Sequence, residues 1–200
     1  DAQESRGLGD VYKRQVQCDI QDVDAGLEAY SSPAFYMIPP IDALMQNTIR
    51  INRSSTADGI ELYTTLAHEG YPGHLYQTVY SSLVCDTQTL PIRKLFSYGG
   101  YVEGWAYYTE RISYEYAAQV LAEAEGSLGS SYPAALLCTL LAQQRDLQIN
   151  LFCLLDLSLH YYGAEESELL RSLESFGLSE EQSERVYDYL RTAPVSYTHL

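Results

Sequence analysis

Two histidines and a glutamate lie within one heptapeptide, His68-Glu69-Gly70-Tyr71-Pro72-Gly73-His74. Two neutral imidazoles can hold a divalent metal ion, and a carboxylate beside them can take a proton from water at that ion. The common helical pattern for this chemistry spaces the histidines four residues apart, on one face. Here they are six apart, which turns the second imidazole about 240° away from the first on an unbroken helix.

The residues between the histidines allow a break in the helix that would bring the two imidazoles together. Gly70 and Gly73 allow unusual backbone dihedrals, and Pro72 lacks an N–H and would clash with the carbonyl of His68. We therefore predict a kink at Tyr71-Pro72 that loops out about two residues and returns His74 to the face of His68. The alternative is a helix broken by Gly and Pro in which the histidines are incidental.

A third ligand is expected on a following helix. Glu103 comes 29 residues after His74, which leaves room for a turn and an antiparallel return. An isolated glutamate is usually solvated, but Gly104-Trp105-Ala106 form an apolar setting in which an unpaired carboxylate would be costly. Glu110 shares the helical face of Glu103 and is either a surface residue or a second carboxylate that orients a liganding imidazole.

Three polar residues interrupt a long apolar stretch further on. Arg145, Asp156 and His160 fall within about 60° of each other on a helix. The i, i+4 pair Asp156 and His160 can fix the tautomer of the histidine. His160 is then either a satisfied core histidine or, with Arg145, a group that binds substrate or an oxyanion.

The remaining pattern indicates a mainly helical chain with a small sheet. Ala34–Ile38 and Thr48–Arg53 read as strands. The second, with Ile49, Arg50, Ile51 and Asn52, is either an edge that pairs with an extended peptide or an ordinary surface strand. A capping box at Asp58–Glu61 predicts a helix from about Gly59, which resumes after Gly73 and ends near Val84. Further helices are expected from Pro91, over Pro133–Tyr162, Glu165–Phe176 and Ser179–Leu190, with a Gly/Ser-rich connection at Glu123–Ser131 and no assignment for Val16–Tyr30.

Composition and charge limit the kinds of partner that this protein could bind. The 200 residues are 46% hydrophobic and carry a formal charge of −15, which argues against nucleic acid or an anionic membrane surface as partner. No apolar run is long enough to span a membrane. The four cysteines show no metal-ligand spacing, and Cys138 and Cys153 lie in apolar sequence that is typical of buried thiols.

Both ends of the chain look foreign. Asp10–Gln15 translates GATGTGTATAAGAGACAG, and Val195–Leu200 translates the complementary strand, which resembles the transposon ends used as DNA-library adapters. We therefore set residues 1–15 and 195–200 aside. We expect residues 16–194 to be part of the catalytic domain of a longer parent protein, and its compartment is left open because the true N-terminus is then missing.

The motifs resemble those of a bacterial family called domain of unknown function 885. The resemblance rests on His68–His74, on Glu103-Gly104-Trp105-Ala106-Tyr107-Tyr108 and on Asp156–Gly163, and it covers nearly all of residues 31–194. That family is grouped with the gluzincin zinc metallopeptidases. The resemblance implies a mostly helical peptidase fold with a small sheet beside the active helix. It implies His68, His74 and Glu103 as zinc ligands and Glu69 as catalytic base.

These observations predict a parent protein that is a zinc-dependent peptide hydrolase, with Glu69 as general base. Family members continue past the position of Pro194 into a segment with a tyrosine that is a candidate oxyanion stabiliser; Tyr197 belongs to the foreign tail and is not given that role. One alternative is a metal- or peptide-binding helical domain without turnover. Another is a structural fragment whose histidines form hydrogen bonds in the core.

Overall fold

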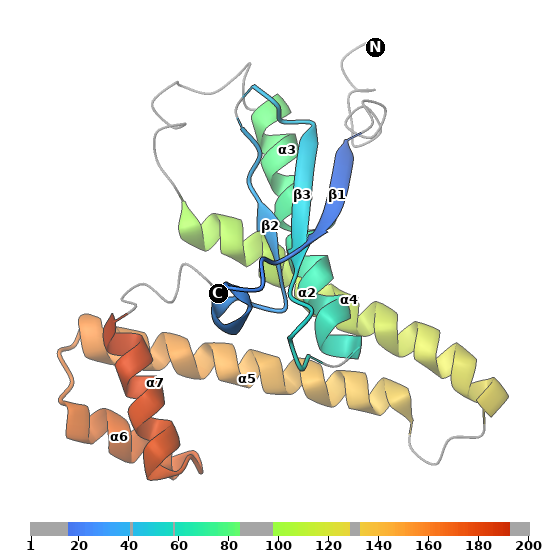
Figure 1. Ribbon diagram of the computed structural model, residues 1–200. Helices are drawn as coiled ribbons and strands as arrows, with labels where there is room; N and C mark the ends of the chain where they lie inside the picture. Colours follow the sequence, from blue (N-terminus) through green and yellow to red (C-terminus); the bar gives the residue numbers. More distant parts are fainter. Residues whose placement is uncertain (1–15, 41, 58, 85–97, 129–132, 193–200) are drawn as a thin grey trace, which may run out of the picture. The chain divides into compact units, whose positions relative to one another are not determined.

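The computed structural model describes residues 16–40, 42–57, 59–84, 98–128 and 133–192. It is mainly helical with a three-stranded sheet (Figure 1). The chain forms two compact units that divide within one helix, between Thr139 and Leu140. The two segments set aside as adapter-derived, 1–15 and 195–200, lie outside the described residues, as do Asp58 of the predicted capping box and Pro91.

The sheet has the strand order β1-β3-β2, with β1 at Gln17–Asp22, β2 at Ala34–Met37 and β3 at Gln46–Ile51. The central strand β3 pairs in parallel with β1 and antiparallel with β2. Of the two alternatives for Ile49, Arg50, Ile51 and Asn52, the edge that pairs with a peptide is therefore wrong, because a neighbouring strand lies on each side of β3. Among the described strands, β1 and β2 are the two outer strands of the sheet.

One face of the sheet carries the core of the first unit. Ala34 and Ile49 pack there with Leu75 and Val79, all at most 5% exposed. Strand β1, in the stretch left unassigned by the sequence, is largely exposed along its length. Its weak signal has a physical reason, since a strand that buries little needs little alternation of apolar and polar residues.

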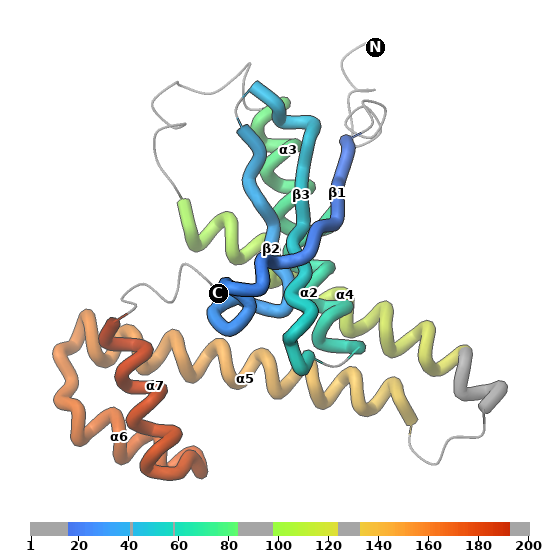
Figure 2. Tube along the Cα trace, viewed as in Figure 1, coloured from blue at the N-terminus to red at the C-terminus, as the bar shows by residue number. Residues whose placement is uncertain are grey.

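The helices of the first unit are α2 at Gly59–Glu69, α3 at His74–Val84 and α4 at Gly99–Leu128. Helix α2 packs along α4 and lies against β2, so the sheet stands beside the helix with the first histidine (Figure 2). The predicted connection at Glu123–Ser131 is corrected, because α4 continues to Leu128. Its Ala and Glu residues are strong helix formers and outweigh the glycine in this stretch.

The second unit holds most of α5 at Ala134–His160, together with α6 at Glu166–Ser175 and α7 at Glu180–Thr192. Its core contains Leu155, Leu169, Leu173 and Leu190. Gly177 lies just after the end of α6 and has a φ of +92°, a backbone conformation that favours glycine. Within the described residues, no helix is both long and apolar enough to cross a membrane.

Candidate metal centre

A sharp turn separates the two histidines. Helix α2 ends at Glu69 and α3 begins at His74, so residues 70–73 leave the helix, a longer interruption than the predicted two residues. The turn is closed by the Gly73 N–H, which donates to the carbonyl of Gly70 at 3.1 Å. A Cβ atom on Gly73 would stand 1.7 Å from the carbonyl oxygen of His68. The close return of the chain therefore requires glycine at this position.

Helix α4 holds this turn in place. The indole Nε1–H of Trp105 donates to the carbonyl of Pro72 at 2.8 Å. The hydroxyl of Thr109 lies 3.2 Å from the carbonyl of Ala67 and 2.8 Å from that of Ala106 in its own helix, and its one proton is shared between them. The Trp105 ring also stacks on Tyr76, with ring centroids 5.9 Å apart. The turn and the helix that supplies the third carboxylate are thus fixed to each other.

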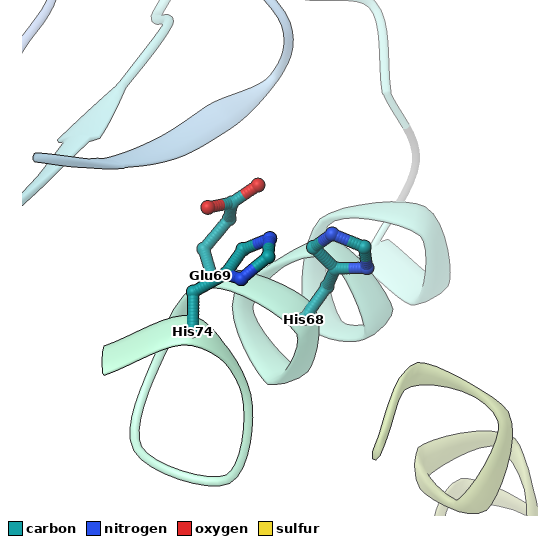
Figure 3. Close-up of side chains that lie close together, drawn as sticks. All are labelled: His68, Glu69 and His74. Carbon is teal, nitrogen blue, oxygen red and sulfur yellow. The ribbon is translucent and has the colours of Figure 1, made fainter. Parts of the chain in front are cut away.

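The turn brings His68 and His74 together. Their ring centroids are 4.7 Å apart and the rings are nearly perpendicular (Figure 3). From α4, the Oε2 atom of Glu103 lies 3.5 Å from Nε2 of His68 and 3.4 Å from Nε2 of His74. All three side chains are 13–15% exposed. The residues predicted as ligands from three separate helical positions therefore converge on one point.

Two of the distances between these atoms agree with a tetrahedral metal ion. Bonds of about 2.0–2.1 Å to nitrogen and oxygen place neighbouring tetrahedral ligands roughly 3.3–3.4 Å apart. The two nitrogen–oxygen distances at Glu103 are 3.4 and 3.5 Å. Two histidines and one glutamate are also a known ligand set of catalytic zinc sites, in which the fourth position is left open.

Glu69 is a second carboxylate close to the imidazoles. His68, Glu69 and His74 offer ligand atoms that all lie within 4.8 Å of one another, so Glu69 competes with Glu103 for the role of third ligand. Glu103 is the better placed of the two carboxylates to be a third ligand, because its Oε2 atom is close to both Nε2 atoms, whereas Oε2 of Glu69 accepts a hydrogen bond from the backbone N–H of Tyr36 at 2.9 Å. Figure 3 shows the Glu69 carboxylate turned toward the strands.

Glu110 contacts the other ring nitrogen of His68. Its Oε2 atom lies 3.0 Å from Nδ1 of His68, and the carboxylate is 7% exposed. A proton on Nδ1 satisfies this carboxylate and leaves Nε2 of His68 free to face Glu103 and His74. The structure thus places Glu110 beside a predicted ligand instead of on the surface.

The charges at this site shift the pKa values of three groups. Burial lowers the pKa of His68, but the carboxylates of Glu103 and Glu110 outweigh it and raise the pKa to about 9. Burial raises the pKa of Glu103, but His68 and His74 outweigh it and lower the pKa to about 2. Burial also raises the pKa of Glu69, against the opposing effect of the Tyr36 N–H.

Arg145, Asp156 and His160 are in the second unit, on α5. His160 donates from Nε2 to the carbonyl of Leu190 at 3.0 Å, and its 3.7 Å distance to the buried Asp156 is too long for a hydrogen bond. His160 is exposed, so it is not a core histidine, but its hydrogen bond to Leu190 favours a structural role.

The side chains of the predicted substrate strand are also engaged within the fold. Ile49 is buried in the core, and Arg50 donates to the carbonyl of Asp22. Asn52 donates to the carbonyls of Glu28 and Ser31. Sequence reasoning missed Tyr36. This residue binds Glu69 through its backbone N–H, and a backbone group cannot be recognised from the type of residue.

The family model described as "Bacterial protein of unknown function (DUF885)" matches residues 8–185. The chain belongs to this family. The match to the DUF885 model begins inside the segment 1–15 that we set aside as foreign, and that assignment stays a prediction.

A solved structure has the same fold as this DUF885 chain. It is described as "The crystal structure of the putative lipoprotein from Colwellia psychrerythraea", with a TM-score of 0.63 and 19% sequence identity. The alignment covers 96% of this chain and 32% of that one, so the chain spans about a third of the length of that protein. Among curated proteins, none matches the chain.

Proposed function

We propose that this chain carries the zinc centre of a peptide hydrolase, with His68, His74 and Glu103 as ligands and Glu69 as general base. The observation that carries the proposal is the convergence of Glu103 Oε2 on both Nε2 atoms, at 3.4 and 3.5 Å, with the Glu69 carboxylate beside them. The chemistry of this donor set suits zinc and leaves one position open for a reacting oxygen.

When bound, zinc supplies Lewis acidity that polarises a carbonyl and lowers the pKa of water toward about 7. Glu69 takes the proton of the attacking water and passes it to the leaving amine. The partial burial of Glu69 raises its pKa, which suits a carboxylate that must first accept a proton and then release it. Glu110 holds the His68 ring in the orientation that the site needs.

An extended peptide is best aligned by β2, which takes over the part first expected of the Ile49–Arg53 strand. The sheet ends at β2 on the side that faces α2 and Glu69. The Tyr36 N–H at this edge is taken by Glu69, so a peptide in extended form would pair with the other outward backbone groups of β2. Arg145 and His160 belong to the second unit, and the binding of an oxyanion or a substrate carboxylate by them stays a prediction from the sequence.

The first experiment is zinc content by mass spectrometry on the purified chain, with His68→Ala and His74→Ala as matched variants. We expect near-stoichiometric zinc in the unchanged chain and a loss of zinc in both variants. A folded chain without zinc would contradict the metal centre. Unchanged zinc content in both variants would favour the alternative in which the histidines are structural.

The second experiment tests turnover in the full-length parent protein, using Glu69→Gln. This variant keeps the shape of the side chain and removes its basicity. We expect full zinc content with a loss of peptide cleavage of about 10²- to 10⁴-fold. A zinc-loaded parent that cleaves no peptide would instead favour the metal- or peptide-binding domain without turnover.

A further inference from the structure

The hydrogen bond between Tyr36 and Glu69 joins the edge of the sheet to the proposed general base. The two residues are 33 positions apart, and the N–H of Tyr36 donates to Oε2 of Glu69 at 2.9 Å. Glu69 is partly buried at the end of α2, where a glutamate side chain otherwise has several rotamers. A backbone donor in a strand is a much more rigid anchor than another side chain.

The register of the sheet shows that this N–H is at a free edge. The Asn52 N–H donates to the carbonyl of Pro33, and Phe35 is aligned with Arg50 in the antiparallel pair. Residues 33, 35 and 37 therefore direct their backbone groups toward β3, and Ala34 and Tyr36 direct theirs away. The outward N–H of Tyr36, which an edge normally leaves to water or another strand, is taken by Glu69.

The strand position of Tyr36 is itself held from inside the sheet. Its hydroxyl donates to Oδ1 of Asn47 at 2.6 Å. Asn47 is 1% exposed, and its amide donates to the carbonyls of Gln17 and Leu44. Tyr36 thus makes two hydrogen bonds, one from its phenol to the buried Asn47 and one from its backbone to the Glu69 carboxylate.

We propose that the backbone N–H of Tyr36 is the positioning group of Glu69: it fixes Oε2 at the sheet edge and leaves Oε1 to accept the proton of the attacking water. The inference rests on the proposed function. It makes Tyr36 a positioning residue through its backbone, while its phenol is needed only to keep the strand in place.

Amide hydrogen exchange tests the contact without any measurement of activity. In the 200-residue chain we expect slow exchange at the Tyr36 amide. In Glu69→Ala we expect exchange there to become at least about tenfold faster, because the outward N–H loses its acceptor. The amides of Phe35 and Met37, which face β3, serve as internal controls and should not change. Equal protection of Tyr36 in both proteins would overturn the inference.

An ester in place of the amide tests the role in turnover. Tyrosine 36 of the parent protein is replaced by its α-hydroxy acid through nonsense suppression, which removes only the N–H and keeps the phenol. We expect kcat to fall about 10- to 100-fold, as for the loss of one charge-assisted hydrogen bond, with zinc content unchanged and KM within about twofold. A merely structural defect would change zinc content or KM as well.

The matched control is the same ester at position 34. It also removes one outward N–H and weakens one carbonyl that faces β3, but no hydrogen bond between the Ala34 N–H and an acceptor is found in the described part of the chain. Equal loss of kcat in both esters, or no loss at position 36, would overturn the inference alone. An inactive wild-type parent would instead overturn the proposed function, and the two failures are therefore distinct.

Discussion

Glu110 reaches from α4 to α2 and places its Oε2 atom 3.0 Å from Nδ1 of His68. The opposite nitrogen of the same ring lies 3.5 Å from Glu103. One imidazole is therefore held between two carboxylates of one helix, which are seven residues apart and share a face. This arrangement sets the tautomer, the ring orientation and the basicity of the proposed ligand.

Glu110→Gln should weaken zinc binding about 10- to 100-fold, because a carboxylate behind a liganding histidine raises its basicity and fixes its ring. The measurement is competition with a chelator of known affinity. Glu115→Gln is the control, since that exposed residue on the same helix pairs only loosely with Arg111 at 3.6 Å. Equal affinities for the two variants would show that the Glu110 contact has no part in metal binding.

Gly73→Ala should destroy the turn between the histidines. The added Cβ would stand 1.7 Å from the His68 carbonyl oxygen, and backbone on both sides must move. We expect a loss of at least about 3 kcal/mol in the free energy of unfolding, together with loss of zinc. In the control, Gly100→Ala, the Cβ meets nothing within 4 Å, so this helical site should gain up to about 1 kcal/mol. Chemical denaturation of both variants measures these changes in the free energy of unfolding.

Zinc binding near pH 7.5 should release about one proton from His68. Its pKa of about 9 keeps the metal-free imidazole charged at that pH, and a metal ligand must be neutral. Titration calorimetry in two buffers with different ionisation enthalpies measures the released proton. Heats that do not depend on the buffer would contradict the prediction. Glu110→Gln should reduce the number of protons released, because it removes one cause of the raised pKa.

The stability of the metal-free chain should fall on both sides of a plateau at mildly acidic pH. His68 has a raised pKa, so its contribution is complete below about 6.5 and is lost as the pH rises through about 9. Glu103 has a lowered pKa, so its contribution is complete above about 4.5 and is lost as the pH falls toward about 2. The alkaline loss should be on the order of 3 kcal/mol.

Denaturation of the metal-free chain between pH 5 and 9 measures that alkaline loss. A matched series on His68→Gln should be nearly flat above pH 6.5, because the titrating imidazole is gone. The same slope in both proteins would assign the pH dependence to other groups.

Two substitutions of His160 separate its alternative roles. His160→Gln keeps a donor for the Leu190 carbonyl, whereas His160→Leu removes it. From the hydrogen bond we expect about 1 kcal/mol less stability in the leucine variant and little change in the glutamine variant. A catalytic role predicts instead that both variants lose kcat in the parent protein while both keep their zinc.

Residue types and local spacing were enough to predict several elements of this fold. The glycines and proline between His68 and His74 predicted a break in the helix, and the structure has a turn at that place. Periodicity placed α5, α6 and α7 within a few residues of their bounds. These features are local, so the information that determines them lies within one or two helical turns of sequence.

Pairings between distant segments were decided only by the tertiary structure. The sequence showed an alternating strand at β3 but not that β1 and β2 would cover both of its sides, since strand order depends on which edges meet in space. It offered Glu110 equally as a surface residue, and only the packing of α4 on α2 brings it to His68. The contact between Tyr36 and Glu69 uses a backbone N–H. Every residue except proline carries this group, so no pattern of side chains could have predicted the contact.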